Sequence, residues 1–274
     1  MEFGNNELLD MCRMCSLCYK NNETIEENYA NKDRETKGVE KKYNILDKCC
    51  SIPIIKTSSS DCQYFVTIYN EMLLICFRGT ESTTDILKDL NIIRTEFNIP
   101  NYNKKQLYVH GGFYSQFNDV HEFINKDILE YLDNDEYKTK TILFTGHSLG
   151  GALATLGACY FGVVYPSILI NCVTFGSPRV GCNQFIKVFA EHCNNSYRFV
   201  NENDPVPSFP SSWRFKHVKG CSWINNDKIL NEILPWRFWR FLKNYCLSCV
   251  GYGYNALEDH YCANYINNLS DAGF

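Results

Sequence analysis

The sequence lacks a basic stripe, an apolar leader and any apolar run long enough to cross a membrane. Its 27 Lys and Arg are outnumbered by 31 Asp and Glu, and no cationic segment predicts a nucleic-acid partner. Residues 1–7 are polar and acidic with no apolar segment behind them, so we expect an intracellular, cytoplasmic location. No apolar run reaches the roughly 18–20 residues of a membrane-spanning helix, which leaves only peripheral contact with a membrane or lipid droplet open.

Linkers and metal-binding patterns are scarce as well. No internal repeat and no Pro-, Gly- or Ser-rich linker divides the chain, so we expect one domain over residues 1–274. The 15 cysteines are an odd number, and without a leader they are best interpreted as reduced, buried thiols. Cys12, Cys15 and Cys18 and a C-x-x-C pattern at 246–249 could hold zinc. However, Cys12 and Cys15 also fall at helical spacing with Leu8, Met11 and Tyr19 and could line one apolar face. We therefore expect no metal and no cofactor.

Strand-like and helix-like segments alternate along the chain. Two β-rich runs flank a two-residue turn at Asn70-Glu71 and predict a hairpin. The predicted strands are 64–69, 72–77, 141–145, 168–175, 197–200 and 215–218. The predicted helices are 7–20, 84–93, one that ends near 132, 182–193 and one at the end of the chain. This alternation predicts an α/β fold with a mostly parallel central sheet flanked by helices. In the helix that ends near 132, the expected core positions are Phe117, Val120, Phe123, Ile124 and Leu129.

The most specific local signal is a G-x-S-x-G pattern at residues 146–150. It follows an apolar run and precedes an Ala- and Leu-rich helical segment. In that context the serine, Ser148, sits on a strained strand-to-helix turn that exposes its hydroxyl above a sheet. Gly146 and Gly150 carry no Cβ, so the helix can pass close to the strand. The pattern therefore predicts a nucleophile.

A serine nucleophile needs a base and a group that orients the base. After this kind of turn the acid follows the serine along the chain and the histidine follows the acid. Asp204 comes just after a predicted strand and is our acid, with Glu202 as its competitor. His260 precedes the last helix and is our base, because the alternative His217 lies within a strand-like run. His147 is expected to be a packed, hydrogen-bonded core residue.

The oxyanion that forms on an attacked carbonyl needs two hydrogen-bond donors. The backbone N–H of Leu149, directly after the nucleophile, supplies one. Thr80, in the loop after an early strand, fits as the other through its N–H and its hydroxyl. The amphipathic segment 84–93 follows that loop.

Six motifs then identify a family. They are Phe77-Arg78-Gly79-Thr80, Val109-His110-Gly111-Gly112-Phe113, Gly146-His147-Ser148-Leu149-Gly150-Gly151-Ala152, Thr174-Phe175-Gly176-Ser177-Pro178-Arg179-Val180-Gly181, Asn203-Asp204-Pro205-Val206-Pro207 and Asp259-His260. In this order they resemble the fungal-type (class 3) lipases, over residues 62–220 and the region of His260. The resemblance implies an α/β-hydrolase fold with Ser148, Asp204 and His260 as a catalytic triad. It also implies Thr80 and Leu149 as oxyanion donors.

The resemblance makes residues 82–95 a short helical lid. By position, Asp89 matches the lid carboxylate that steadies the oxyanion-hole hydroxyl in such lipases. The segment 228–256 matches no pattern in the family. Its mixture of aromatic and basic residues fits a helix with a buried aromatic face, which we favour, or a segment that lies at a lipid interface.

The expected function is that of a serine hydrolase, a triacyl- or diacylglycerol lipase that cleaves carboxylic esters of lipids through an acyl-enzyme. A phospholipase A or a soluble carboxylesterase would use the same residues. A catalytically silent lipid-binding or scaffold protein is the alternative of another class, although such a protein has no need for a serine, an acid, a histidine and an oxyanion hole together.

Overall fold

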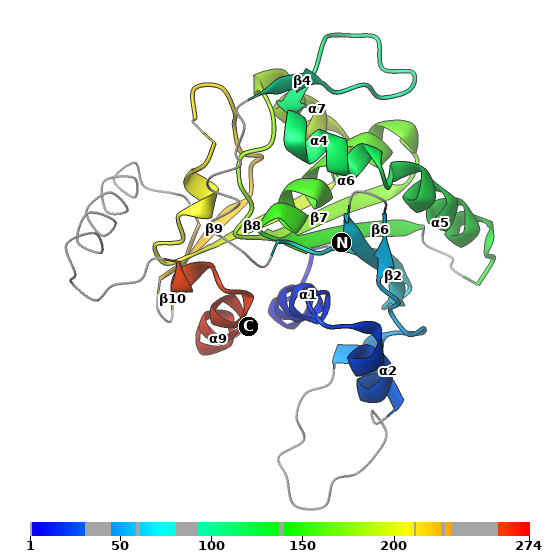
Figure 1. The fold of residues 1–274 in the computed structure, drawn as a ribbon, viewed down its shortest axis with the longest axis vertical. Helices are drawn as coiled ribbons and strands as arrows, with labels where there is room; N and C mark the ends of the chain where they lie inside the picture. The colour runs from blue at the N-terminus through cyan, green and yellow to red at the C-terminus, as the bar shows by residue number, and fades with distance from the viewer. Residues whose placement is uncertain are drawn as a thin grey trace, which may run out of the picture.

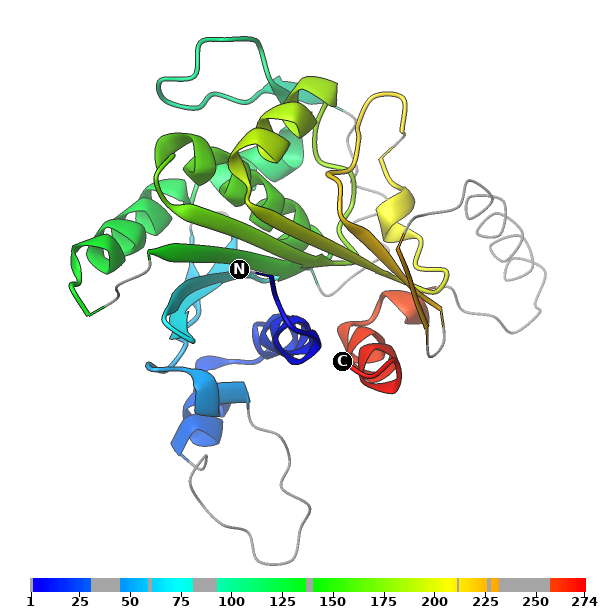
Figure 2. The same ribbon diagram turned by 180° about the vertical axis from the view of Figure 1, so that it is seen from behind.

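The computed structural model describes residues 2–30, 45–58, 61–80, 93–136, 140–210, 212–225, 228–231 and 257–274. A central sheet carries helices on both faces, as Figures 1 and 2 show from opposite sides. The expected lid at 82–95, with Asp89, lies outside the described residues except for its last three. The segment 228–256 also lies outside them, except for residues 228–231. No helix in the described ranges has the length and apolar character needed to cross a membrane.

The central sheet has eight strands in the order β1-β2-β3-β6-β7-β8-β9-β10. Neighbours from β3 to β9 are parallel, whereas β1, β2 and β10 pair antiparallel at the two edges. The strands are β1 (Lys56–Thr57), β2 (Gln63–Tyr69), β3 (Met72–Phe77), β6 (Thr141–His147), β7 (Leu169–Phe175), β8 (Asn195–Asn201), β9 (Cys221–Asn225) and β10 (Lys228–Asn231). The predicted hairpin and the mostly parallel sheet are confirmed.

Strand β3 shows why its sequence is apolar throughout. Successive side chains of a strand point to opposite faces, and here both faces are covered. Leu73, Ile75 and Phe77 belong to one buried cluster, and Leu74 and Cys76 belong to another on the opposite face. A strand buried on both sides loses the alternation of polar and apolar residues and becomes a continuous apolar run.

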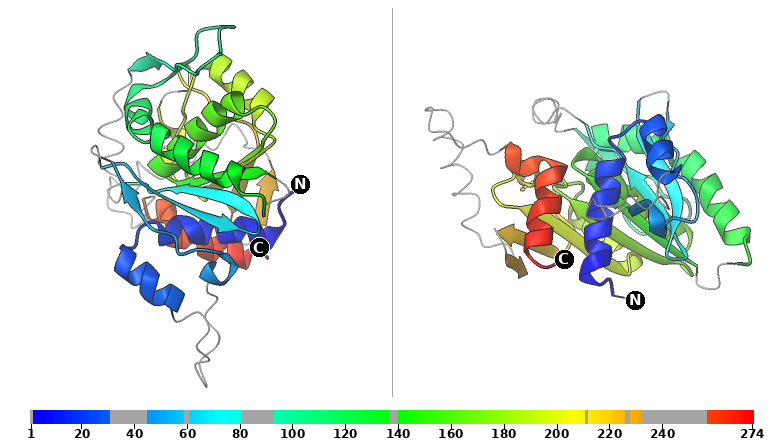
Figure 3. Two further views of the ribbon diagram at one scale, coloured as in Figure 1. Left: turned by 90° about the vertical axis from the view of Figure 1, so that its right-hand side faces the viewer. Right: turned by 90° about the horizontal axis from the view of Figure 1, so that it is seen from below.

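Among the described residues, four helices cover one face of the sheet and two cover the other. The first group is α4 (Gly111–Asn118), α5 (His121–Asp133), α6 (Leu149–Val164) and α7 (Asn183–His192). The second is α1 (Asn5–Leu17) and α9 (Cys262–Asp271), which lie side by side although they come from opposite ends of the sequence (Figure 3). A further helix, α2 (Asn22–Ala30), packs against the short helix η1 (Ile45–Lys48).

Two details differ from the sequence prediction. The helix expected to end near residue 132 is split into α4 and α5 at residues 119–120. The buried face of α5 is Ile124, Ile128 and Tyr131. Phe123 and Leu129 were predicted in the core, but each is one position off that face, and they are 62% and 45% exposed.

The predicted strand at 215–218 is also wrong. Lys216 forms only an isolated bridge with Gly181. The strand that pairs with β8 is β9, which begins at Cys221. Farther from the sheet, β4 (Arg94–Glu96) pairs with β5 (Tyr108–His110), so the last two residues of the expected lid belong to a strand.

The parallel strands bring several loops to one edge of the sheet. β3, β6, β7 and β8 end at Phe77, His147, Phe175 and Asn201. Ligands of open α/β sheets bind outside the carboxyl ends of such strands. The loops that begin after these four residues therefore define where a site should be sought.

Candidate active site

Ser148 occupies a strained turn between β6 and α6, which we call the serine elbow (residues 146–151). Its φ of 58° and ψ of −126° lie in a region that residues with a side chain rarely adopt. Its N–H donates to the carbonyl oxygen of Phe175 at 2.9 Å. A Cβ on Gly150 would lie 2.2 Å from the carbonyl oxygen of Phe77, so only glycine lets α6 start this close to β3.

The loop after β3 runs directly against the elbow. A Cβ on Gly79 would lie 2.6 Å from the carbonyl oxygen of His147 and 3.2 Å from Cβ of Ser148. The next residue, Thr80, lines a cavity of about 370 Å³ together with Leu149. The structure thus brings the two predicted oxyanion donors to the same opening beside Ser148.

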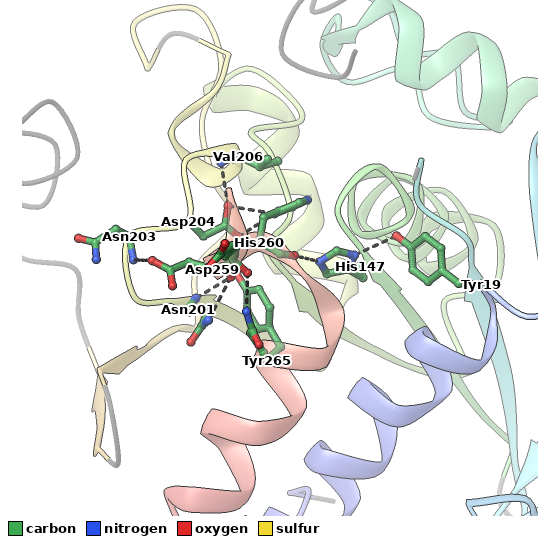
Figure 4. Close-up of polar contacts among 11 residues, drawn as sticks. Tyr19, His147, Asn201, Asn203, Asp204, Val206, Asp259, His260 and Tyr265 are labelled. Carbon is green, nitrogen blue, oxygen red and sulfur yellow. Dashed lines mark hydrogen bonds and ion pairs between the residues drawn. The ribbon is translucent and has the colours of Figure 1, made fainter. Parts of the chain in front are cut away.

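Asp204 and His260 are in direct contact. Nδ1 of His260 lies 2.9 Å from each carboxylate oxygen of Asp204, and both residues are almost fully buried, at 1% and 2% exposure. The carboxylate also accepts hydrogen bonds from the hydroxyl of Tyr265 at 2.6 Å and from the N–H of Val206 at 2.9 Å. Figure 4 shows these groups converging on Asp204. Four interactions therefore fix this carboxylate in one orientation.

The proton on His260 follows from these contacts. A carboxylate only accepts hydrogen bonds, so Nδ1 carries a hydrogen, and in the neutral imidazole Nε2 is then the nitrogen with the lone pair. Within the described ranges, Nε2 of His260 and Oγ of Ser148 are buried and have no hydrogen-bond partner. Buried polar atoms without a partner are rare and usually have a functional explanation. A proton transfer between these two atoms is such an explanation.

A second cavity, of about 350 Å³, reaches the histidine from the side of α1. Its lining residues are Ser16, Tyr19, Lys20, Thr80, His147, His260, Tyr261 and Cys262. Thr80 lines both cavities. Any molecule that reaches His260 through this opening therefore also passes the predicted oxyanion loop.

His147 contributes more than the packing we expected of it. It is buried and hydrogen-bonded, but Nε2 lies 2.7 Å from the carbonyl oxygen of His260, and Nδ1 lies 2.9 Å from the hydroxyl of Tyr19 (Figure 4). Burial, and then the electrostatic interaction with the neighbouring His260 ring, lower the pKa of His147 well below its usual value. His147 is consequently a neutral imidazole that packs beside His260, the predicted base.

A set of hydrogen bonds anchors residues 257–271, which we call the histidine arm, to the end of β8. Asn203 donates its N–H to the carboxylate of Asp259 at 3.0 Å, and the amide of Asn201 donates to the carbonyl oxygen of Asp259 at 3.0 Å. The amide of Asn268 donates to the side-chain oxygen of Asn201 at 2.8 Å. Sequence reasoning missed the roles of Tyr19, Tyr265 and these asparagines, because no local pattern links residues so far apart.

The alternative candidates lie elsewhere. Nε2 of His217 is 2.7 Å from the carbonyl oxygen of Pro207. The backbone N–H of Glu202 donates to the carbonyl oxygen of Ile224, and the carbonyl oxygen of Glu202 accepts from the indole N–H of Trp223. The lid carboxylate Asp89 lies outside the described residues.

The cysteines in the described ranges are free thiols. In the same ranges, no three His, Cys, Asp or Glu side chains are grouped so that they could hold a metal ion. Cys12 and Cys15 on α1 and Cys18, directly after its end, are buried, and the C-x-x-C pattern at 246–249 lies outside the described part of the chain.

Three comparisons with known proteins place the chain among lipases. A family model described as "Lipase (class 3)" matches residues 74–213. The sequence is 32% identical over 160 residues to the secreted mono- and diacylglycerol lipase A of Penicillium cyclopium, covering 57% of this chain and 49% of that protein. It is 25% identical over 243 residues to the secreted mono- and diacylglycerol lipase 2 of Gibberella zeae, covering 71% and 59%. The chain thus spans about half the length of these relatives.

A solved structure agrees with the fold. The lipase of Rhizomucor miehei in complex with its propeptide superposes with a TM-score of 0.67 at 22% identity, over 83% of this chain and 70% of that one. The predicted α/β-hydrolase fold is confirmed. The predicted intracellular location is wrong by the same comparisons, since both fungal relatives are named as secreted. The polar residues at the start of this sequence are not evidence about its compartment.

Proposed function

This chain belongs to the class 3 lipase family, and from that premise we propose that it is a serine esterase that cleaves carboxylic esters of glycerolipids. The observation that carries the proposal is the buried pair of Asp204 and His260, whose hydrogen bond leaves Nε2 of His260 free as a base. The unpartnered hydroxyl of Ser148 at the serine elbow supports it.

The proposed reaction begins at Ser148. Nε2 of His260 takes the proton from the hydroxyl while Oγ attacks the ester carbonyl carbon. Asp204 holds the imidazole through Nδ1 and stabilises the imidazolium. The N–H groups of Thr80 and Leu149 donate hydrogen bonds to the carbonyl oxygen, on which negative charge develops.

The histidine then acts as an acid. The leaving alkoxide takes the proton from Nε2 of His260, and the acyl group stays on Ser148 as an ester. A water molecule, deprotonated by the same nitrogen, then attacks this ester and releases the fatty acid, returning the proton to Ser148. Hydrogen-bond donors that are in place before the reaction need no rearrangement during the step.

The proposed substrates are acylglycerols met at a lipid surface outside the cell. The two fungal relatives are mono- and diacylglycerol lipases and secreted by name, which supports this choice. Contact with the lipid surface, the lid at 82–95 and the support of the oxyanion hydroxyl by Asp89 are part of the proposal and rest on the family resemblance.

The test is covalent labelling of Ser148. A fluorophosphonate probe should label the wild type, and the Ser148→Ala variant should lose labelling and about 10⁴-fold or more of kcat on dioleoylglycerol. The Ser115→Ala variant, with a change at an exposed position of α4, is the matched control and should retain both. An unlabelled wild type without ester hydrolysis would instead favour the silent lipid-binding alternative.

One observation favours a second candidate, a phospholipase of the A type. The leaving alcohol must lie beside His260, which protonates it, and Lys20 lines the same cavity. An ammonium group can pair with the phosphate of a lipid headgroup. The polar groups of Ser16 and Tyr261 in this cavity suit glycerol hydroxyls equally.

Replacing Lys20 separates the two candidates. If the enzyme uses a phosphate headgroup, the Lys20→Met variant should lower kcat/KM on dioleoyl phosphatidic acid about three- to tenfold and leave dioleoylglycerol cleavage within about twofold. Lys187→Met, on the far face of the molecule, is the control. Equal effects on both lipids would count against the phospholipase.

A further inference from the structure

Tyr19 lies outside the segment that matches the family model, yet it contacts the candidate site. It follows the end of α1, its side chain is half-buried, and it lines the cavity that contains His260. Its hydroxyl lies 2.9 Å from Nδ1 of His147 (Figure 4). This contact joins residues 128 positions apart in the sequence, so no local motif could predict it.

The direction of each hydrogen bond in this contact is determined. The carbonyl oxygen of His260 can only accept, so Nε2 of His147 carries the hydrogen of the 2.7 Å contact. His147 is neutral, so its Nδ1 must accept. Burial raises the pKa of Tyr19, and the phenol therefore stays protonated and donates. The result is a chain from the hydroxyl of Tyr19, through His147, to the backbone of His260.

The same tyrosine also packs against the oxyanion loop and restricts the space around Gly79. A Cβ on Gly79 would lie 2.2 Å from the hydroxyl oxygen of Tyr19. The guanidinium of Arg78 lies over the tyrosine ring, 5.6 Å from its centroid. Tyr19 therefore abuts the two residues that precede Thr80 while it bonds to the ring beside His260.

We propose that Tyr19 is a positioning residue of the ester cleavage. It holds the backbone of His260 and the Gly79–Thr80 loop in fixed positions relative to Ser148. The inference rests on the proposed function. Tyr19 acts on the base through His147, whose ring centroid is 4.6 Å from that of His260. A reacting group displaced by about 1 Å can cost roughly 10²-fold in rate, so a single lost hydroxyl can be expected to matter.

The first test is the Tyr19→Phe variant, which removes only the hydroxyl. We expect kcat on dioleoylglycerol to fall about 10- to 100-fold while KM stays within about threefold, because positioning acts on the reacting groups rather than on lipid binding. Rates are normalised to the fraction of enzyme labelled by a fluorophosphonate. Tyr102→Phe, a half-buried tyrosine on the other face of the sheet, is the matched control.

The second test separates positioning from mere packing. His147→Gln keeps one donor and one acceptor in the side chain and should retain several-fold more kcat than His147→Leu, which keeps neither. In the background of His147→Leu, adding Tyr19→Phe should cause no further loss of kcat, because the chain of hydrogen bonds is already broken.

The outcomes are distinct. If the wild type is active and the normalised kcat of Tyr19→Phe equals that of the wild type, the inference about Tyr19 is overturned and the proposed function stands. A loss that disappears after normalisation, or equal kcat in the Gln and Leu variants of His147, also overturns it by indicating a structural role. A wild type that neither hydrolyses ester nor binds the probe overturns the proposed function, and the inference falls with it.

Discussion

The serine elbow and the histidine arm lie against each other but are built in opposite ways. In the elbow, Ser148 is held by its own turn and by glycines that let two neighbouring strands and one helix approach closely. In the arm, His260 is held by partners 56 and 113 positions away, Asp204 and His147. One half of the site is determined locally, and the other depends on contacts between distant segments.

This difference predicts how each half should fail. A local turn is sensitive to any atom added to its backbone, because neighbouring strands leave no room for it. A network of distant hydrogen bonds should weaken by degrees as single partners are removed, since the remaining bonds still hold the group. The variants below test this contrast, beginning with the largest expected effect.

The Gly150→Ala variant should damage the elbow most. Its Cβ would meet the backbone of Phe77 at 2.2 Å, so β3 and the oxyanion loop would have to shift. We expect a loss of about 3–5 kcal/mol in the free energy of unfolding, measured by urea denaturation. In Gly112→Ala the Cβ meets only the ring of His110, at 3.4 Å, and this control should stay within about 1 kcal/mol of the wild type. Equal losses in the two variants would contradict the account of the elbow.

The Tyr265→Phe variant should weaken the arm without dismantling it. The hydroxyl donates to Asp204 and accepts from the N–H of Asn201 at 2.9 Å. Asp204 keeps its bonds to Val206 and His260 after the change. We expect about a tenfold fall in kcat, an unchanged KM and a loss of about 1–2 kcal/mol in stability. A loss of activity as complete as that of Ser148→Ala would show that the arm is not a graded network.

The neutral His147 should make stability depend on pH. Its folded pKa is depressed by burial, so below about pH 6.5 the unfolded chain binds a proton that the folded chain does not. Stability from this group is complete above pH 6.5 and should fall by up to about 1.4 kcal/mol per pH unit below it. Urea denaturation at pH 7 and pH 5 should therefore show a smaller loss in His147→Gln than in the wild type. If the wild type and His147→Gln lost the same stability between pH 7 and pH 5, His147 would be charged in the folded protein.

The smallest effect is expected just beyond the end of the histidine arm, far from His260. The amide of Asn5 donates to the carbonyl oxygen of Gly273 at 3.3 Å, at an exposed position where α1 meets the end of α9. Asn5→Ala should change stability by less than about 0.5 kcal/mol and leave kcat unchanged. A marked loss of kcat would show that the position of His260 depends on the whole pairing of α1 and α9 rather than on the contacts near His260.

The sequence was most informative where neighbours in the chain are neighbours in space. The hairpin, the strands and the turn at Ser148 could be predicted because each has a short pattern with its own physical cause. Asp204 and His260 were selected from their order and from their places after a strand and before a helix, and the structure places them in contact.

Tertiary packing decided what the sequence could not. The apolar pattern of α5 gave no sign that a break at residues 119–120 would turn Phe123 outward. Residues 215–218 have the composition of a strand, but the partner position beside β8 is taken by β9. Tyr19 and Tyr265 looked like ordinary helix residues, because their hydroxyls find partners only after the sheet has brought distant segments together.

The pairing of α1 with α9 also predicts an order in which the site is completed. The contact between Cys12 and Cys262 closes a loop of 250 positions, and contacts of such high sequence separation form late during folding. The strands, α6 and the elbow can assemble while the histidine arm is still on the ribosome or undocked. We therefore expect Ser148 to reach its turn before Asp204 and His260 are paired, and this pairing to wait until α9 has docked beside α1.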